Sequence, residues 1–86
     1  MSSREEVRQR LVGMLLEFDP DLPAADLTPD RRLLDLAIDS LTLMAVLLDV
    51  EDGFGIRLSE QHLAKITTIG DFEGAIIAVL ERNGSD

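Results

Sequence analysis

The chain has 86 residues, no cysteine and a formal net charge of −9. This length predicts a single domain over residues 1–86, whose modest core must be packed mainly by Leu, Ile, Val and Met because only three residues are aromatic. The charge disfavours binding to nucleic acid or to an anionic membrane surface and favours basic partner surfaces. The missing cysteine excludes disulfides and thiolate metal sites. With no recognisable secretion signal or membrane-spanning run, we expect a cytoplasmic monomer.

A first helix is predicted over residues 4–18. Ser3-x-x-Glu6 is a capping-box pattern that starts it, and Pro20 lies just beyond its end. Gly13, inside the helix, is expected to mark a close approach by another helix. Apolar side chains recur at spacings of three and four residues: Val7, Leu11, Met14, Leu15 and Phe18.

Residues 19–38 are predicted to form a long connection with a turn at Thr28-Pro29-Asp30. Its apolar side chains follow no sustained period, yet so many of them are not expected to remain in water. We therefore expect the connection to lie across the helices and to bury these side chains: Leu27, Leu33, Leu34, Leu36 and Ile38.

A second helix is predicted from Ser40 to about Asp52, with Asp39 as its N-cap. It is apolar around nearly its whole circumference, so more than one side must be covered. One side is expected to anchor the helix in the core: Val46, Val50 and Phe54, flanked by Leu43 and Leu47. The other side has an apolar row with the i, i+4, i+7 spacing of a docking stripe: Leu41, Ala45 and Leu48. Single exposed apolar residues are also common on protein surfaces, but this alignment favours a partner surface.

Acidic residues concentrate around this second helix: Asp35, Asp39, Asp49, Glu51, Asp52 and Glu60. They are opposed in that span only by Arg57, and such a patch steers basic partners into contact. A calcium loop is not predicted, because EF-hand spacing would place Leu48 or Val50 at the first ligand position. We therefore add three acids to the expected docking surface: Asp49, Glu51 and Asp52.

Ser59 is expected to cap a short third helix over residues 60–65, and Thr67 or Thr68 to cap a fourth. Asp71 then lies in the first turn of the fourth helix, where the helix dipole favours an acid. The inward stripe of that helix is predicted to be Ile69, Phe72, Ile76, Val79 and Leu80. No segment has the period of a strand, so the predicted class is all-α. We expect a small four-helix bundle with three main helices, one short helix and a long loop after the first.

Ser40 is the residue with the most suggestive chemistry. A catalytic serine needs a base and an oxyanion site, and nothing in the sequence aims the single histidine, His62, at Ser40. Neither a glycine-rich phosphate loop nor a metal-ligand cluster is present, so an enzyme is not predicted. A hydroxyl in the first turn of a helix can instead carry a phosphate ester, because unpaired backbone N–H groups favour an anion there. Position alone favours an ordinary helix-start serine, because serines are abundant at helix starts.

The segment from Leu36 to Ile69 resembles acyl carrier proteins, and the likeness extends over the helix order of the whole chain. Asp39-Ser40-Leu41 matches the family's Asp-Ser-Leu attachment motif. Two further motifs resemble the end of the family's second helix and the start of its last helix: Glu51-Asp52-x-Phe54-x-Ile56 and Lys65-Ile66-Thr67-Thr68-Ile69-Gly70-Asp71.

The resemblance implies that a separate phosphopantetheinyl transferase esterifies Ser40 with 4′-phosphopantetheine from coenzyme A, and that Asp39 helps that enzyme recognise the site. The arm's thiol would hold an acyl or aminoacyl group as a thioester, which a loading enzyme supplies and an acyltransferase or synthase uses. The second helix would be the main docking surface for these partners.

Three residues depart from the family's common pattern. Ala37 stands where the family often has Gly, and Thr42 and Ala45 occupy positions that are often acidic in fatty-acid carriers. Ala37 changes only the freedom of the loop, whereas Thr42 and Ala45 favour a stand-alone carrier of polyketide or related specialised biosynthesis, antibiotic biosynthesis included. The alternative is a protein-interaction module that uses the apolar and acidic surface of the second helix without being modified.

Overall fold

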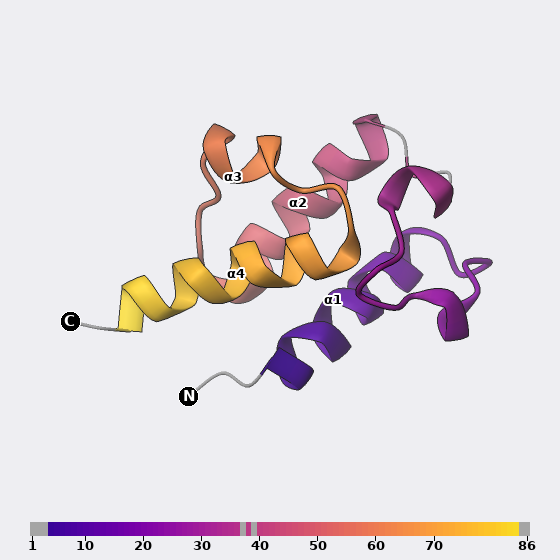
Figure 1. Ribbon diagram of the computed structural model, residues 1–86, viewed down its shortest axis with the longest axis horizontal. Helices are drawn as coiled ribbons and strands as arrows, with labels where there is room; N and C mark the ends of the chain where they lie inside the picture. Colours follow the sequence, from indigo (N-terminus) through magenta and orange to yellow (C-terminus); the bar gives the residue numbers. More distant parts are fainter. Residues whose placement is uncertain (1–3, 37, 39, 85–86) are drawn as a thin grey trace.

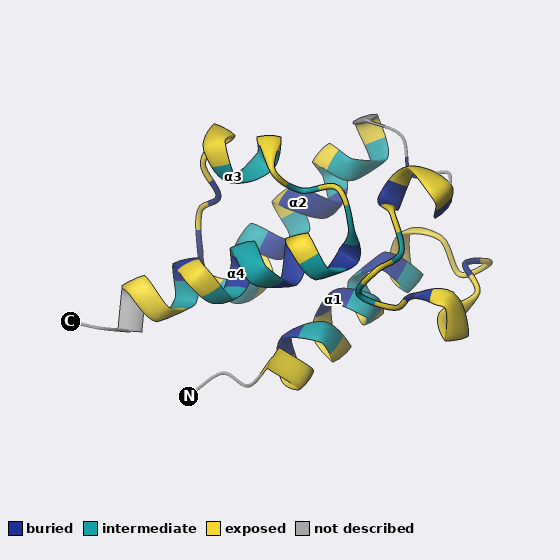
Figure 2. Cartoon of the chain, viewed as in Figure 1, coloured by how far each residue is buried: buried dark blue, intermediate teal, exposed yellow. Residues whose placement is uncertain are grey.

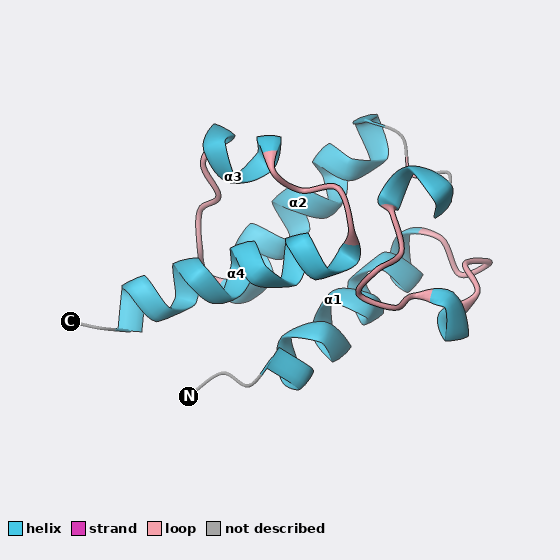
Figure 3. Ribbon diagram, viewed as in Figure 1, coloured by secondary structure: helices cyan, strands magenta, loops and turns pink. Residues whose placement is uncertain are grey.

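The computed structural model describes residues 4–36, 38 and 40–84, and it shows a bundle of helices joined by loops (Figures 1 and 3). The α-helices are α1 Arg4–Phe18, α2 Ser40–Phe54, α3 Glu60–Ala64 and α4 Ile69–Gly84. Within the described residues there is no β-strand, only an isolated bridge between Arg32 and Thr68. The predicted all-α class and helix order are confirmed. In the same residues, no helix combines the length and the apolar character needed to cross a membrane.

Helix α1 has the predicted bounds and packs against both α2 and α4. Of the apolar row that the spacing predicted, Val7, Leu11 and Leu15 are buried and Met14 is partly buried, whereas Phe18 at the end of the helix is 43% exposed. The expectation for Gly13 is wrong, because this residue is exposed and a Cβ there would have no atom within 4 Å. The close approach lies instead at Gly53 of α2, where a Cβ would lie 2.5 Å from the Cε of Met14.

The core lies between α1, α2 and α4, where Figure 2 shows the buried residues. The predicted stripe of α4 is confirmed: Ile69, Phe72 and Ile76 are fully buried, Val79 is 8% exposed and Leu80 is partly buried against the same cluster. Helix α3 is a single short turn that ends at Ala64, one residue before the predicted end.

The long connection between α1 and α2 contains two short 3-10 helices that the sequence did not predict, η1 Ala24–Asp26 and η2 Leu33–Leu36. Its apolar side chains are buried as expected, with one exception: Leu27, Leu33, Leu36 and Ile38 are buried. The expectation for Leu34 is wrong, because its side chain is 78% exposed. Residues three apart share a side of a 3-10 turn, so burying Leu33 and Leu36 turns Leu34 outward.

Backbone hydrogen bonds hold this connection against the start of α4. The N–H of Leu33 donates to the carbonyl of Thr67 at 3.0 Å, and the N–H of Gly70 donates to that of Pro29 at 2.7 Å. Only glycine fits at residue 70 without a shift, because a Cβ would lie 2.8 Å from the Pro29 carbonyl oxygen. The chain that leads to α2 is therefore anchored on α4.

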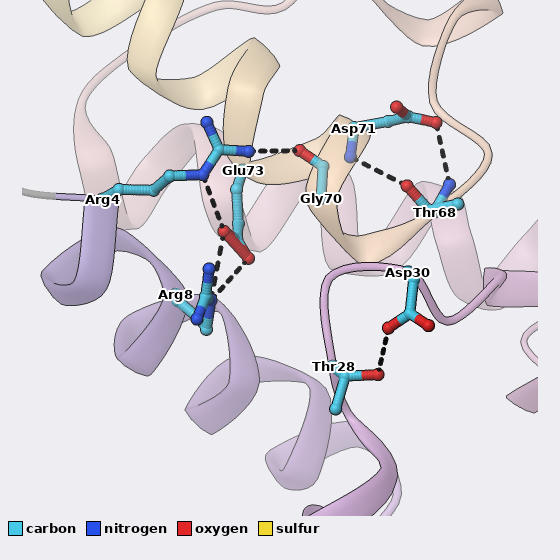
Figure 4. A network of polar contacts seen from close by, with 8 residues as sticks. All are labelled: Arg4, Arg8, Thr28, Asp30, Thr68, Gly70, Asp71 and Glu73. Carbon is cyan, nitrogen blue, oxygen red and sulfur yellow. Dashed lines mark hydrogen bonds and ion pairs between the residues drawn. The ribbon is translucent and has the colours of Figure 1, made fainter.

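A buried carboxylate joins α1 to α4 (Figure 4). Glu73 of α4 is fully buried, and its Oε2 accepts a hydrogen bond from the Arg8 Nε at 2.9 Å. The Arg4 Nε lies 3.4 Å from Glu73 Oε1, and Arg4 also donates to the Gly70 carbonyl at 3.2 Å. The two guanidinium groups satisfy a charge that burial would otherwise make costly. Sequence periodicity did not reveal this network, because its partners are 65 residues or more apart.

The end of α2 is fixed by α1. The Arg10 Nη2 donates to the Gly53 carbonyl at 2.6 Å, and its guanidinium lies 4.1 Å from the centre of the Phe54 ring. A cation at this end of a helix also complements the helix dipole. Gly55 follows with a positive φ of 67°, which glycine adopts without strain and which ends α2 two residues after the predicted position.

Candidate functional site: the start and outer face of α2

Ser40 is the first residue of α2. Just before it the chain is anchored by Ile38, which is 5% exposed, and just after it Leu41 is 82% exposed. The chain therefore passes from the core to the surface where α2 begins. Ala37 and Asp39 lie outside the described residues, and so does the predicted N-cap contact of Asp39.

The electrostatics of this helix start suit an anionic group. Helix α2 has 15 residues, and its first N–H groups have no partner inside the helix, which gives this end a partial positive charge. The described first turn contains no acidic residue that would repel a phosphate. Asp35, in η2, is paired with Arg32 at 3.2 Å. The residues present therefore fit a phosphate ester at the start of α2.

The outer face of α2 is an apolar surface. Leu41 and Leu48 of the predicted stripe are 82% and 62% exposed, and Ala45 between them is partly exposed. Met44, at 52% exposure, joins this face, although the sequence analysis did not single it out. A helix that is apolar on every side carries no periodic signal for which side faces water, so Met44 could not be assigned from the pattern. We call Leu41, Met44, Ala45 and Leu48 the outer row.

The inner face of α2 forms the core contacts that the spacing predicted. Val46 and Val50 are fully buried and Leu47 is 4% exposed. Leu43 and Phe54 are partly buried and pack against the same cluster. Because these residues hold α2 in place, the outer row is not needed for the core.

Among the described residues, two acids of the predicted docking surface have no hydrogen bond or ion pair, whereas the third accepts a hydrogen bond. Asp49 is partly exposed and Asp52 is exposed. Glu51 is partly buried, and its Oε2 accepts a hydrogen bond from the Leu58 N–H at 2.9 Å. This bond holds the loop after α2 against the helix, so Glu51 has a structural role that the sequence did not predict.

A small cavity opens beside the first turns of α2. It has a volume of about 150 Å³ and lies between the end of α1, the loop that follows and the start of α2. Its lining offers about as much polar as apolar surface and comes from Leu15, Phe18, Asp19, Leu22, Ile38, Thr42 and Val46. Thr42, one of the residues that departs from the pattern of fatty-acid carriers, lines the cavity.

His62 has a structural role in α3. The Ser59 N–H donates to its Nδ1 at 3.2 Å, and the Ser59 hydroxyl accepts from the His62 N–H at 3.3 Å. These two bonds form a capping box, and they confirm Ser59 as the cap of α3. At the next helix Thr68 accepts from the Asp71 N–H at 3.0 Å, and Asp71 Oδ2 accepts from the Thr68 N–H (Figure 4). The same oxygen also accepts from the Thr67 N–H at 3.0 Å. These bonds hold the pKa of Asp71 below its usual value.

The described residues form a small helical bundle in which α2 begins beside an exposed apolar face. Residues 9–76 match the family model described as phosphopantetheine attachment site. The chain is 31% identical over 83 residues to an acyl carrier protein of Thermotoga maritima, covering 95% of this chain and 96% of that protein. It is 32% identical over 78 residues to the acyl carrier protein MbtL of Mycolicibacterium paratuberculosis, covering 90% and 86%.

The chain therefore belongs to the phosphopantetheine-binding acyl carrier family. It is a carrier of covalently attached 4′-phosphopantetheine and not an enzyme. Proteins of this kind work with transferases, loading enzymes and synthases, so the surface that meets these partners is as important as the attachment point.

Proposed function

We propose that Ser40 is the residue that carries the phosphopantetheine arm, and that the arm presents acyl or aminoacyl groups to partner enzymes as thioesters. The observation that carries this proposal is that Ser40 is the first residue of a 15-residue helix and that Leu41, the next residue, is 82% exposed. In the transfer reaction the Ser40 Oγ–P bond forms, the pyrophosphate P–O bond of coenzyme A breaks, and the nucleotide leaves with the electron pair.

The partner enzymes dock on the outer row of α2 and on the acids beside it. An exposed apolar row flanked by carboxylates favours a partner with an apolar pocket and a basic rim. Asp49 and Asp52 supply charge that steers association, whereas Glu51 contributes mainly through the loop that it holds. Asp39 remains our candidate for recognition by the transferase, on the basis of the Asp-Ser-Leu motif.

We further propose that the protein is a stand-alone carrier in polyketide or related specialised biosynthesis. It would act in the cytoplasm, where coenzyme A and a transferase are available. Thr42 and Ala45 support this role, because acids at these positions are common in fatty-acid carriers. The cavity of about 150 Å³ beside Thr42 suits a short cargo rather than a long chain.

The attachment residue is tested by incubating the purified protein with coenzyme A and a broad-specificity phosphopantetheinyl transferase. We expect the intact mass to increase by one arm, and Ser40→Ala to abolish the increase. Thr42→Val is the matched control, because it removes the next hydroxyl of the same helix and should leave the mass gain intact. An unchanged mass with several transferases, or a gain that persists in Ser40→Ala, contradicts the assignment.

The docking surface is tested in the same assay through its kinetics. Leu48→Glu places a charge in the outer row, and we expect kcat/KM for modification to fall about tenfold or more. Ala78→Glu adds the same charge at an exposed position of α4 and should change the rate little. Equal rates for Leu48→Glu and Ala78→Glu would show that the transferase does not dock on the outer row. Partner binding that needs Leu48 but ignores Ser40→Ala, in a protein that no transferase modifies, would instead indicate an unmodified interaction module.

A further inference from the structure

The exposed apolar side chains of the protein gather around α2. Among the described residues, five large apolar side chains are exposed. Three belong to the outer row, and the other two are Leu34 of η2 and Phe18 at the end of α1. The described parts of α3 and α4 contribute none. Single exposed apolar residues need no explanation, but a group drawn from three neighbouring segments indicates an interaction surface.

Backbone contacts keep Leu34 close to the start of α2. The Ile38 N–H donates to the Leu33 carbonyl at 3.4 Å, so the chain folds back at η2, and Ser40 follows Ile38 by two residues. With about 3.8 Å between consecutive Cα atoms, this bond keeps the Cα of Leu34 less than about 20 Å from that of Ser40. In Figure 1, η2 (magenta) lies beside the start of α2. Phe18 is near the same helix start, because it lines the small cavity together with Ile38.

The neighbours of Leu34 hold its side chain outward. Leu33 and Leu36 are buried in the core, and the Leu33 N–H donates to the Thr67 carbonyl at 3.0 Å. The backbone of η2 is therefore fixed before any partner arrives. A side chain on a fixed backbone loses little further entropy when a partner covers it.

The surface beside Leu34 is electrically neutral, unlike the far end of α2. Arg31 and Arg32 lie in the same connection, and each is paired with a carboxylate at 3.2 Å. Asp49 and Asp52 are roughly 14–18 Å from the start of α2 at 1.5 Å per residue. The face that surrounds the attachment point therefore has a neutral apolar part near Ser40 and an acidic part farther along the helix.

We propose that Leu34 extends the docking surface from α2 onto the long connection, and that it is an apolar contact of the phosphopantetheinyl transferase. This inference rests on the proposed attachment at Ser40. The transferase must bring its catalytic groups to the Ser40 Oγ itself, whereas later partners reach the cargo through the length of the arm. A standard interface has about 800 Å² per partner and is roughly 30 Å across, so one that includes Ser40 is wide enough to cover Leu34. A second copy of this chain is a poorer occupant, because each copy has a net charge of −9.

The test compares two substitutions of Leu34 in the transferase assay. Leu34→Gln keeps the approximate size of the side chain but makes it polar, and we expect kcat/KM for arm transfer to fall about fivefold. Leu34→Met keeps an apolar side chain of similar volume and should retain at least about half of the wild-type value. Neither substitution should shift the urea midpoint, because the side chain is 78% exposed.

Salt separates the apolar contact from charge steering. We expect Leu34→Gln to cause the same loss of kcat/KM in about 50 mM and about 500 mM NaCl, between which the screening length changes about threefold. Asp52→Asn is the comparison, because it removes a charge from the acidic part of the surface. Its loss should be measurable at low salt and absent at high salt.

The outcomes distinguish this contact from the attachment itself. If the wild type gains no arm, the attachment at Ser40 and the Leu34 contact both fail. If the wild type is modified and Leu34→Gln reacts equally fast, only the Leu34 contact is overturned. Equal losses in Leu34→Gln and Leu34→Met, or a loss that disappears at high salt, would also overturn it. So would a wild-type dimer in sedimentation that Leu34→Gln dissociates, because Leu34 would then join two copies of the chain.

Discussion

The contact of α1 with α4 and the outer row of α2 are built in opposite ways. Between α1 and α4 every described polar group that is buried has a partner, and Glu73 is held by two arginines from the facing helix. On the outer row three large apolar side chains face water. The polar contacts between α1 and α4 stabilise the fold. The outer row instead leaves apolar surface exposed, as expected for a face that partner proteins cover temporarily. The difference between the two regions can be tested by substitution.

Substitutions at two adjacent residues of α2 should give the largest difference in the free energy of unfolding. Leu47 is 4% exposed and Leu48 is 62% exposed. Leu47→Ala should lower the free energy of unfolding by about 2–5 kcal/mol, because it removes buried methyl groups and leaves a cavity. Leu48→Ala should change it by less than about 0.5 kcal/mol. Urea unfolding of the two variants measures both, and equal losses would contradict the division of α2 into inner and outer faces.

The Glu73 network should show the next effect. Glu73→Gln keeps the shape but removes the charge that Arg4 and Arg8 bind, and we expect a loss of about 1–3 kcal/mol. The loss stays below that of a fully buried ion pair because both arginines remain partly in water. Glu17→Gln, at an exposed position of α1, is the control and should have little effect in the same urea titration. A wild-type midpoint for Glu73→Gln would show that the network is not stabilising.

Two glycines of α4 should respond with opposite sign. Gly70→Ala places a Cβ 2.8 Å from the Pro29 carbonyl oxygen and should cost about 1–3 kcal/mol. Gly74 has nothing within 4 Å of the same position, so Gly74→Ala should stabilise α4 by up to about 1 kcal/mol. Thermal unfolding distinguishes them. A stabilising Gly70→Ala would indicate that the loop is not anchored on α4.

The smallest expected effect is the pH dependence of the contribution that Asp71 makes to stability. The hydrogen bonds from Thr67 and Thr68 lower the pKa of Asp71 in the folded state, so its contribution is complete above the unfolded value of about 3.9. That contribution is lost as the pH falls through the lowered pKa, because protonation removes the acceptor charge. Asp71→Asn should therefore cost roughly 0.3–1 kcal/mol at pH 7 and progressively less in acid. Asp52→Asn, which removes an exposed carboxylate of α2, should show no such dependence in urea titrations at several pH values.

Local signals predicted much of the fold from the sequence. The period of α1, the caps Ser59 and Thr68, and the inward stripe of α4 all depend on neighbours within a few residues, and all are confirmed. Contacts between distant segments left no such signal. The buried Glu73, the exposed Leu34 and the open space around Gly13 each depend on what another segment does, so the sequence missed the first and misassigned the other two.

The candidate site was predictable to a similar degree. The Asp-Ser-Leu motif singled out Ser40 as the candidate attachment residue, which stays a prediction, and the spacing of the stripe predicted the exposed Leu41 and Leu48. Met44 was missed because α2 is apolar on every side, and the structural bond of Glu51 was missed because its partner lies in a loop. The position of a site follows from a local motif, whereas the surface around it depends on packing.

The proposal on which the others depend is that Ser40 carries the phosphopantetheine arm. Its most direct test is fragmentation mass spectrometry of the intact protein isolated from its own cells, without added coenzyme A or transferase. We expect one phosphopantetheine arm, with or without cargo, localised by the fragments to Ser40. An arm localised to any other residue, or a population that carries no arm at all, would contradict it.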